Sequence, residues 1–175
     1  MNHAFGYDPA LSTYVQSRVA NLGGVGHAAL DLACGSGRHS TFLARHGYQV
    51  VAADLDMRRL VSFEGQTEIE RGSVSRVKVD ASGYLPFRDG SFDIVIVVHF
   101  VTPGLIANVA PLLRSRGHLL IETYGGHGEN WRALPAPGQY REELSAAFEV
   151  VDYNERLVGP TKTEAASVRL LASRR

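Results

Sequence analysis

Short apolar runs alternate along the chain with segments whose apolar residues recur at helical spacing. The run from Phe92 to Phe100 (FDIVIVVHF) is almost wholly apolar and β-branched, as expected of a central parallel strand covered on both faces. Between residues 10 and 20 the apolar positions fit one face of a helix instead. This alternation predicts a doubly wound α/β sheet. The expected strands are 28–33, 48–53, 76–80, 92–100, 118–124, 149–157 and 167–172, and the expected helices are 10–20, 38–46, 57–63, 105–113 and 139–148.

The chain length bounds the domain organisation. A chain of 175 residues suits one domain with one well-buried core. We therefore expect a single-domain Rossmann-like doubly wound sheet of seven strands, with the last strand antiparallel, over residues 1–175. Residues 1–27 are expected to form an N-terminal helical cover, and residues 28–175 the Rossmann-like core.

The clearest candidate site is the strand, turn and helix around Asp31-Leu-Ala-Cys-Gly35-Ser-Gly37. The two glycines let the backbone turn sharply and let a ligand approach closely. The helix that follows directs free N–H groups and the positive end of its dipole toward that ligand. Asp54 ends the second strand, where its carboxylate can accept hydrogen bonds from both hydroxyls of a ribose. Together these features predict a ligand that contains adenosine.

Three further residues favour one adenosine cofactor over another. Ser40 stands where dinucleotide-binding proteins have a third glycine, so the close packing of a pyrophosphate site is missing. Asp31 would repel a pyrophosphate but could attract an ammonium group, and it could also orient the turn by hydrogen bonding. Asp80 ends the third strand and could bind an adenine amino group or cap the next turn. These residues favour S-adenosylmethionine over a nicotinamide dinucleotide.

The segment ALDLACGSGRHSTFLARHGYQVVAADLD resembles the first two motifs of class I S-adenosylmethionine-dependent methyltransferases. Its Asp-Leu-x-Cys-Gly-x-Gly-Arg-x-Ser variant is similar to that of the small tellurite-resistance methyltransferases. The likeness continues through VKVDAS, YLPFRDGSFDIVIVVHF and LLRSRGHLLIETYG, and more faintly through PGQYREELSAAFEVVDYNE, so it covers about residues 28–155.

The resemblance implies a cofactor role for each matching residue. The methionine part would be framed by Asp31, Gly35 and Gly37. Asp54 would hold the ribose, and Leu55 would pack on the adenine. The adenine amino group would meet Asp80, with Ala81 supplying a backbone N–H. Ala33 belongs to the same cofactor-binding motif and stands where the family has its first glycine.

Two polar residues at strand ends are candidates for chemistry. His99 ends the fourth expected strand, on the edge where open α/β sheets bind ligands. Its imidazole could take a proton from a nucleophile or could simply form a hydrogen-bonded pocket wall. Glu122 lies near the end of the fifth strand and could recognise a cationic group or satisfy a loop. A metal site of His99, Glu122 and His127 is not expected, because no tight ligand spacing supports it.

Aromatic residues lie in two segments that can cover the cofactor in this kind of fold. Tyr14 follows Phe5 and Tyr7 near the N-terminus, and Trp131 lies with His127 and Tyr140 in or beside a long Gly- and Pro-rich loop. We expect Tyr14 and Trp131 to shape a substrate pocket and exclude water. Their alternative role is to anchor these segments.

The charge balance limits the partners. Lys and Arg number 18 and Asp and Glu number 18, which argues against general attraction to DNA, RNA or an anionic membrane. The single cysteine cannot form an intramolecular disulfide, and neither a signal pattern nor an apolar stretch of about 20 residues is visible. We expect a cytoplasmic methyltransferase with a small-molecule substrate, a thiol or an oxyanion by family analogy. A non-catalytic S-adenosylmethionine-binding regulatory protein and a nicotinamide-dependent oxidoreductase remain alternatives.

Overall fold

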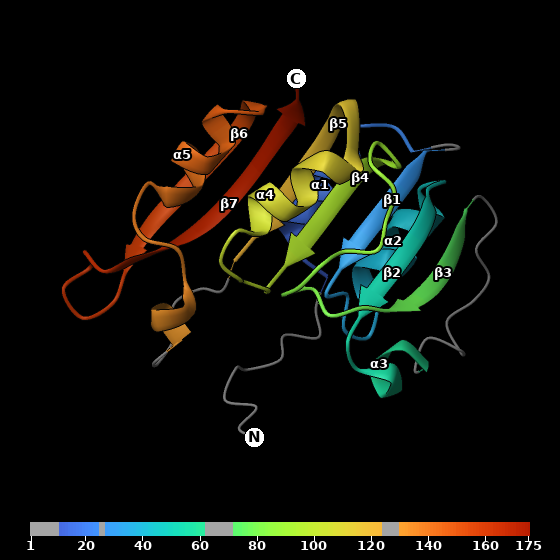
Figure 1. Ribbon diagram of the computed structural model, residues 1–175, viewed down its shortest axis with the longest axis horizontal. Helices are drawn as coiled ribbons and strands as arrows, with labels where there is room; N and C mark the ends of the chain where they lie inside the picture. The colour runs from blue at the N-terminus through green and yellow to red at the C-terminus, as the bar shows by residue number, and fades with distance from the viewer. Residues whose placement is uncertain (1–10, 25–26, 62–71, 124–129) are drawn as a thin grey trace.

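The computed structural model describes residues 11–24, 27–61, 72–123 and 130–175 (Figure 1). These residues form one seven-stranded sheet in the order β3-β2-β1-β4-β5-β7-β6. The strands are β1 (Ala28–Leu32), β2 (Gln49–Asp54), β3 (Ser73–Lys78), β4 (Phe92–Val98), β5 (Leu113–Glu122), β6 (Phe148–Val158) and β7 (Ala165–Arg174). The helices are α1 (Thr13–Val19), α2 (Arg38–Arg45), α3 (Met57–Val61), α4 (Leu105–Val109) and α5 (Gln139–Ser145), with 3-10 turns η2 (Ala110–Leu112) and η3 (Asn130–Ala133).

The sheet is parallel from β3 to β5 and antiparallel where β7 pairs with β5 and β6. This arrangement confirms the predicted Rossmann-like sheet of seven strands with an antiparallel last strand. The strand order reverses between β1 and β4, and in open α/β sheets ligands bind beyond the carboxyl ends of the strands at such a point. The arrowheads of β1, β2 and β4 end at the edge of the sheet near α3 (Figure 1).

Helices cover both faces of the sheet, because the strands are apolar on both sides. On one face α4 and α5 pack on a core that includes Leu30, Val97 and Ile121. On the other face α1 and α2 pack on a core that includes Ile96 and Leu120. None of the helices in the described ranges is long and apolar enough to cross a membrane.

Several boundaries differ from the sequence-based expectation, and those of β5, β3 and α4 have a visible physical reason. β5 begins at Leu113 rather than at residue 118, and its register against β4 shifts between Phe92 and Ile94. This irregular stretch includes Arg116, whose φ is 64°. Its sequence is therefore typical of a turn, although the strand continues through it. β3 begins three residues early, at Ser73, because it is an edge strand of mostly exposed residues without an apolar pattern. α4 ends at Val109 because Pro111 converts the next residues to a 3-10 turn.

Candidate functional site

The turn between β1 and α2 has an unusual backbone. Ala33, Gly35 and Gly37 adopt left-handed conformations, with φ values of 57°, 58° and 73°. The Cys34 N–H donates to the Ala53 carbonyl at 3.0 Å, which fastens the turn to β2. Glycine adopts these angles freely, whereas the Cβ of Ala33 costs about 1–2 kcal/mol there. The position that lacks the expected glycine is therefore strained.

Asp54 holds this turn from the end of β2. Its Oδ2 accepts a hydrogen bond from the Gly35 N–H at 2.7 Å, and its Oδ1 accepts one from the Asp56 N–H at 2.8 Å. The side chain lies at the carboxyl edge and is largely buried. A carboxylate offers about four acceptor positions, so these two backbone bonds leave capacity for further donors.

Asp31 lies inside the protein, under the turn. It is 1% exposed, and its Oδ2 accepts a hydrogen bond from the Ser40 hydroxyl at 2.5 Å. Burial raises the pKa of Asp31 to about 7, while the hydrogen bonds from Ser40 and the charge of Arg38 oppose that rise. Ser40 stands where dinucleotide-binding proteins have their third glycine, and its hydrogen bond to Asp31 connects α2 to β1. This geometry favours the role of orienting the turn.

The ends of β2 and β3 carry the residues expected around an adenine. Leu55 follows Asp54 and is 58% exposed. Asp80 is exposed, and its Oδ1 accepts bonds from the Ser82 N–H at 2.9 Å and the Ser82 hydroxyl at 2.6 Å. These two bonds hold the pKa of Asp80 below its usual value. Ala81 is small and buried, so an apolar side chain and an acid lie at neighbouring strand ends.

His99 and Glu122 lie next to each other at the same edge. His99 follows β4 with a φ of 59°, and its N–H donates to the Glu122 carbonyl at 2.7 Å. The Glu122 carboxylate is buried, and its Oε1 accepts a bond from Arg169 Nε at 2.7 Å. Its Oε2 accepts a bond from the Ser12 hydroxyl. Glu122 is therefore already bound to two residues of this chain.

Ser12 joins three elements at this edge. Its hydroxyl caps α1 by accepting from the Val15 N–H at 3.2 Å while it donates to Glu122. Its own N–H donates to Nε2 of His39, in the first turn of α2, at 3.2 Å. Burial lowers the pKa of His39 to about 3, helped by the charges of Arg38 and His99, so His39 is neutral at physiological pH. Ser12 thus links α1, α2 and β5 beside His99.

Several of these residues could not be identified as site residues from the sequence. Ser12, His39 and Arg169 become recognisable only once distant segments meet, because their hydrogen-bond partners lie far along the chain. Arg59 of α3 was missed too; its Nη1 lies 3.8 Å from the position that a Cβ on Gly35 would occupy. A run of arginines after the second strand was the only signal for it.

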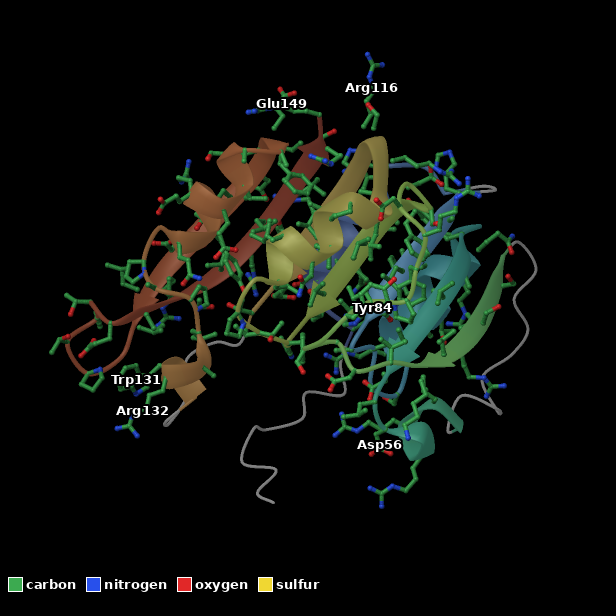
Figure 2. All side chains as sticks on the ribbon, in the orientation of Figure 1. Asp56, Tyr84, Arg116, Trp131, Arg132 and Glu149 are labelled. Carbon is green, nitrogen blue, oxygen red and sulfur yellow. The ribbon has the colours of Figure 1, made fainter. Side chains whose placement is uncertain are left out.

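The two aromatic residues expected to shape a substrate pocket, Tyr14 and Trp131, lie in separate clusters of the described structure. The Tyr14 hydroxyl donates to Asp152 Oδ2 at 3.0 Å, and Arg18 pairs with the same oxygen at 2.5 Å. Trp131 instead packs near Leu134, beside the turn between β6 and β7, with Arg132 over its ring. Figure 2 shows Trp131 at the same edge as Asp56. Tyr140 is buried on the α4 and α5 face, and Phe5, Tyr7 and His127 lie outside the described residues.

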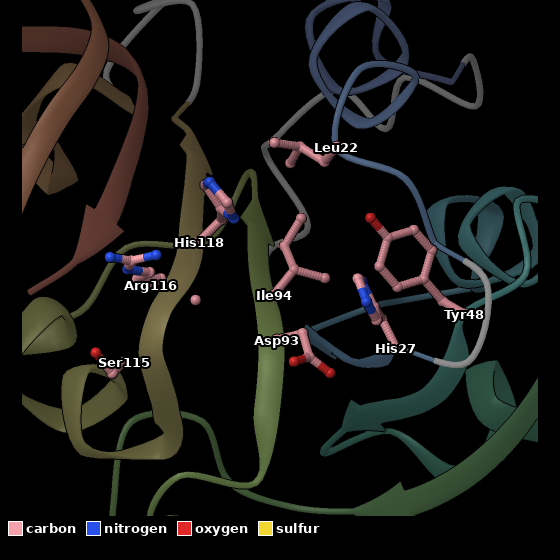
Figure 3. A pocket seen from close by; sticks show the side chains of 9 residues that line it. Leu22, His27, Tyr48, Asp93, Ile94, Ser115, Arg116 and His118 are labelled. Atoms are coloured by element: carbon pink, nitrogen blue, oxygen red, sulfur yellow. The ribbon is translucent and has the colours of Figure 1, made fainter.

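A cavity of about 210 Å³ lies at the opposite, amino edge of the sheet (Figure 3). Asp93 there accepts a bond from the Ala28 N–H at 2.7 Å and pairs with Arg114 at 2.8 Å. Burial lowers the pKa of His118. Through its contacts with Ala28 and Arg114, Asp93 joins the starts of β1, β4 and β5. The lining residues are Leu22, His27, Tyr48, Asp93, Ile94, Ser115, Arg116, Gly117 and His118.

The sequence around the carboxyl edge matches a known family. Residues 30–121, more than half of the chain, match the model of the methyltransferase domain family. The chain belongs to this family. The expected family resemblance is thereby confirmed. Over 87 residues the chain is 32% identical to an uncharacterized methyltransferase from Synechocystis sp., a match that covers 48% of this chain and 39% of that protein. The chain thus spans well under half of this curated relative.

Solved structures share the fold of this methyltransferase-family chain. TehB from Haemophilus influenzae is 19% identical with a TM-score of 0.71, over 96% of this chain and 64% of that one. A putative S-adenosylmethionine-dependent methyltransferase from Listeria monocytogenes is 13% identical with a TM-score of 0.70, over 93% and 98%. The [4+2]-cyclase SpnF is 18% identical with a TM-score of 0.69, over 91% and 78%. One fold therefore carries different activities.

Restoring the family's first glycine should relieve the strained turn. We expect Ala33→Gly to raise the free energy of unfolding by about 0.5–1 kcal/mol, because relief of the left-handed Cβ outweighs the greater chain entropy of glycine. Urea denaturation of both proteins measures this change. Ala29→Gly, at a buried β1 position without positive φ, is the matched control and should lose about 1 kcal/mol. A comparable loss of unfolding free energy in Ala33→Gly would show that the backbone at Ala33 is not strained.

The raised pKa of Asp31 predicts a pH-dependent stability. Ionising this carboxyl costs more in the folded than in the unfolded chain, so stability should fall as pH rises from about 4 to about 7. Asp31→Asn keeps an acceptor for Ser40 without the charge and should lack this fall when the two proteins are unfolded in urea at several pH values. Asp80→Asn is the control of opposite sign, because the pKa of Asp80 is lowered. If the stability of wild type and of Asp31→Asn changed with pH in the same way, the raised pKa of Asp31 would be contradicted.

Proposed function

We propose that this chain transfers a methyl group from S-adenosylmethionine to a small-molecule acceptor. The observation that carries the proposal is the Asp54 carboxylate, which holds the Gly35 turn and has an exposed Leu55 beside it at the carboxyl edge. Family membership supports methyl transfer. Bound S-adenosylmethionine would supply an electrophilic methyl group on a positively charged sulfur.

The described residues fit this cofactor. Asp54 has acceptor capacity left for the ribose hydroxyls, and Leu55 offers an apolar surface to the adenine. Asp80 and the N–H of Ala81 would meet the side of the adenine ring that carries its amino group. The Gly35 position leaves the backbone open to the methionine part, because apart from its chain neighbours no described atom lies closer than 3.8 Å to its missing Cβ. Asp31 would act through Ser40 by fixing the turn.

The acceptor would bind next to His99. The chain's contribution would be to orient the acceptor and exclude water, effects that together are worth up to about 7–11 kcal/mol. An imidazole nitrogen of His99 would form the pocket wall and could take a proton from a hydroxyl or thiol acceptor. Cys34 is not suited to attack a substrate, because burial and the charges of Asp31 and Asp54 raise its pKa. A thiol or oxyanion acceptor rests on analogy to TehB-type proteins.

Two alternatives have different support. A protein that binds the cofactor without methyl transfer is compatible with the fold, since a cyclase shares it. A nicotinamide-dependent oxidoreductase is disfavoured by Ser40, whose side chain fills the position of the third dinucleotide glycine and bonds to Asp31. Calorimetric titration with S-adenosylhomocysteine and with NADH distinguishes the oxidoreductase from both other functions.

The proposal is tested by a methyl-transfer screen with the labelled cofactor. We expect S-adenosylhomocysteine to bind, NADH not to bind, and label to pass to at least one acceptor in a panel of small thiols, oxyanions and metabolites. His99→Gln should reduce the rate for acceptors that lose a proton more than for acceptors that are already anionic. Binding of NADH without S-adenosylhomocysteine would refute the assignment. Cofactor binding without transfer to any acceptor would favour the non-catalytic alternative.

A further inference from the structure

Arg169 presents a guanidinium at the carboxyl edge of the sheet. It lies on β7 directly opposite Glu122 on β5, and its Nε donates to Glu122 Oε1 at 2.7 Å. The two side chains differ sharply in exposure, with 7% of Glu122 and 55% of Arg169 accessible. A buried carboxylate therefore holds one side of a guanidinium that belongs to a side chain more than half exposed.

The guanidinium is held in a fixed orientation. Ser12 binds the second oxygen of Glu122, so the carboxylate itself cannot swing freely. The Arg169 Cζ also lies 5.9 Å from the centre of the Tyr14 ring, which restricts it from a second side. Arginine has five N–H donors in a planar fork that matches carboxylate geometry. A fork held in place before binding loses less side-chain entropy when an anion arrives.

Arg169 lies within reach of the candidate acceptor position beside His99. Val98 pairs with Glu122, and Glu122 pairs with Arg169, on three neighbouring strands. With about 4.8 Å between strands, the backbones of Val98 and Arg169 lie roughly 10 Å apart. The Arg169 side chain reaches across to Glu122 on the strand between them, so a molecule with two groups separated by three or four bonds would span the rest of the interval.

The other described charges around Arg169 leave little there to attract a cation. Glu122 is bonded to Arg169 and Ser12, and Asp152 is paired with Arg18. His39 is neutral because burial lowers its pKa to about 3. A cationic acceptor, which Glu122 was a candidate to recognise, would have to compete with these bonds.

We propose that Arg169 determines acceptor specificity by binding a carboxylate or similar oxyanion group on the acceptor, a few bonds from the atom that is methylated. The inference rests on the proposed function, because it gives the acceptor site its substrate class. Glu122 and Ser12 are positioning residues that hold Arg169. The oxyanion group lies over β7 and the reacting atom lies beside His99.

The test compares two probes with the same thiol and the same number of carbon atoms, one ending in a carboxylate and the other in a neutral hydroxymethyl group. Their binding to the chain saturated with S-adenosylhomocysteine is measured by calorimetry, with 3-mercaptopropionate as the anionic probe and 3-mercapto-1-propanol as the neutral one. We expect the anionic probe to bind at least about tenfold more tightly, as charge-assisted hydrogen bonds to a guanidinium require. Arg169→Gln should remove this preference and leave the affinity for S-adenosylhomocysteine unchanged.

Arg114→Gln is the matched control. Arg114 is 51% exposed and also pairs with an acid, Asp93, but lies at the amino edge, so its substitution should keep the preference. If Arg169→Gln unfolds because Glu122 is left unpaired, the double variant Glu122→Gln/Arg169→Gln removes the pair as a neutral unit. Equal binding of the two probes by wild type, or a preference that survives the loss of Arg169, would overturn the inference. Failure of S-adenosylhomocysteine to bind wild type would instead contradict the proposed function.

Discussion

The hydrogen bond from the Gly35 N–H to the Asp54 carboxylate is the interaction on which the carboxyl edge depends. It joins the turn after β1 to the end of β2, and with the bond from Cys34 to Ala53 it fixes a backbone that is left-handed at three positions. Because α2 begins directly after this turn, the direction of its first N–H groups follows from the same bond. The buried pair of Asp31 and Ser40 supports the turn from below.

Polar groups at the two edges of the sheet are used differently. At the carboxyl edge Leu55, Asp80 and Arg169 direct exposed groups outward. At the amino edge Asp93 is bonded to the backbone of β1 and to Arg114, so it joins strand starts together. Exposed polar and apolar groups therefore lie at the edge where the strand-order reversal between β1 and β4 leads one to expect a ligand.

The sequence predicted those features whose signals are local. The turn glycines, the acid that ends β2 and the apolar β4 run are all visible within short segments, and the sheet they imply is confirmed. Ser12 was not predictable, because its partner Glu122 is 110 residues away. The strain at Ala33 and the register shift in β5 depend on contacts with other strands, so no local sequence pattern indicates them. The cofactor and substrate roles of individual residues stay predictions.

The central claim, that Asp54 both holds the turn and binds the ribose, is tested most directly by the affinity of Asp54→Ala for S-adenosylhomocysteine. The account predicts a loss of about 1–3 kcal/mol in binding, because charged hydrogen bonds are removed. Asp93→Ala is the control, since it removes a carboxylate that also accepts a backbone N–H but lies at the amino edge. Calorimetry on folded protein, checked by circular dichroism, gives both values. A folded Asp54→Ala protein that binds S-adenosylhomocysteine as tightly as wild type would contradict the account.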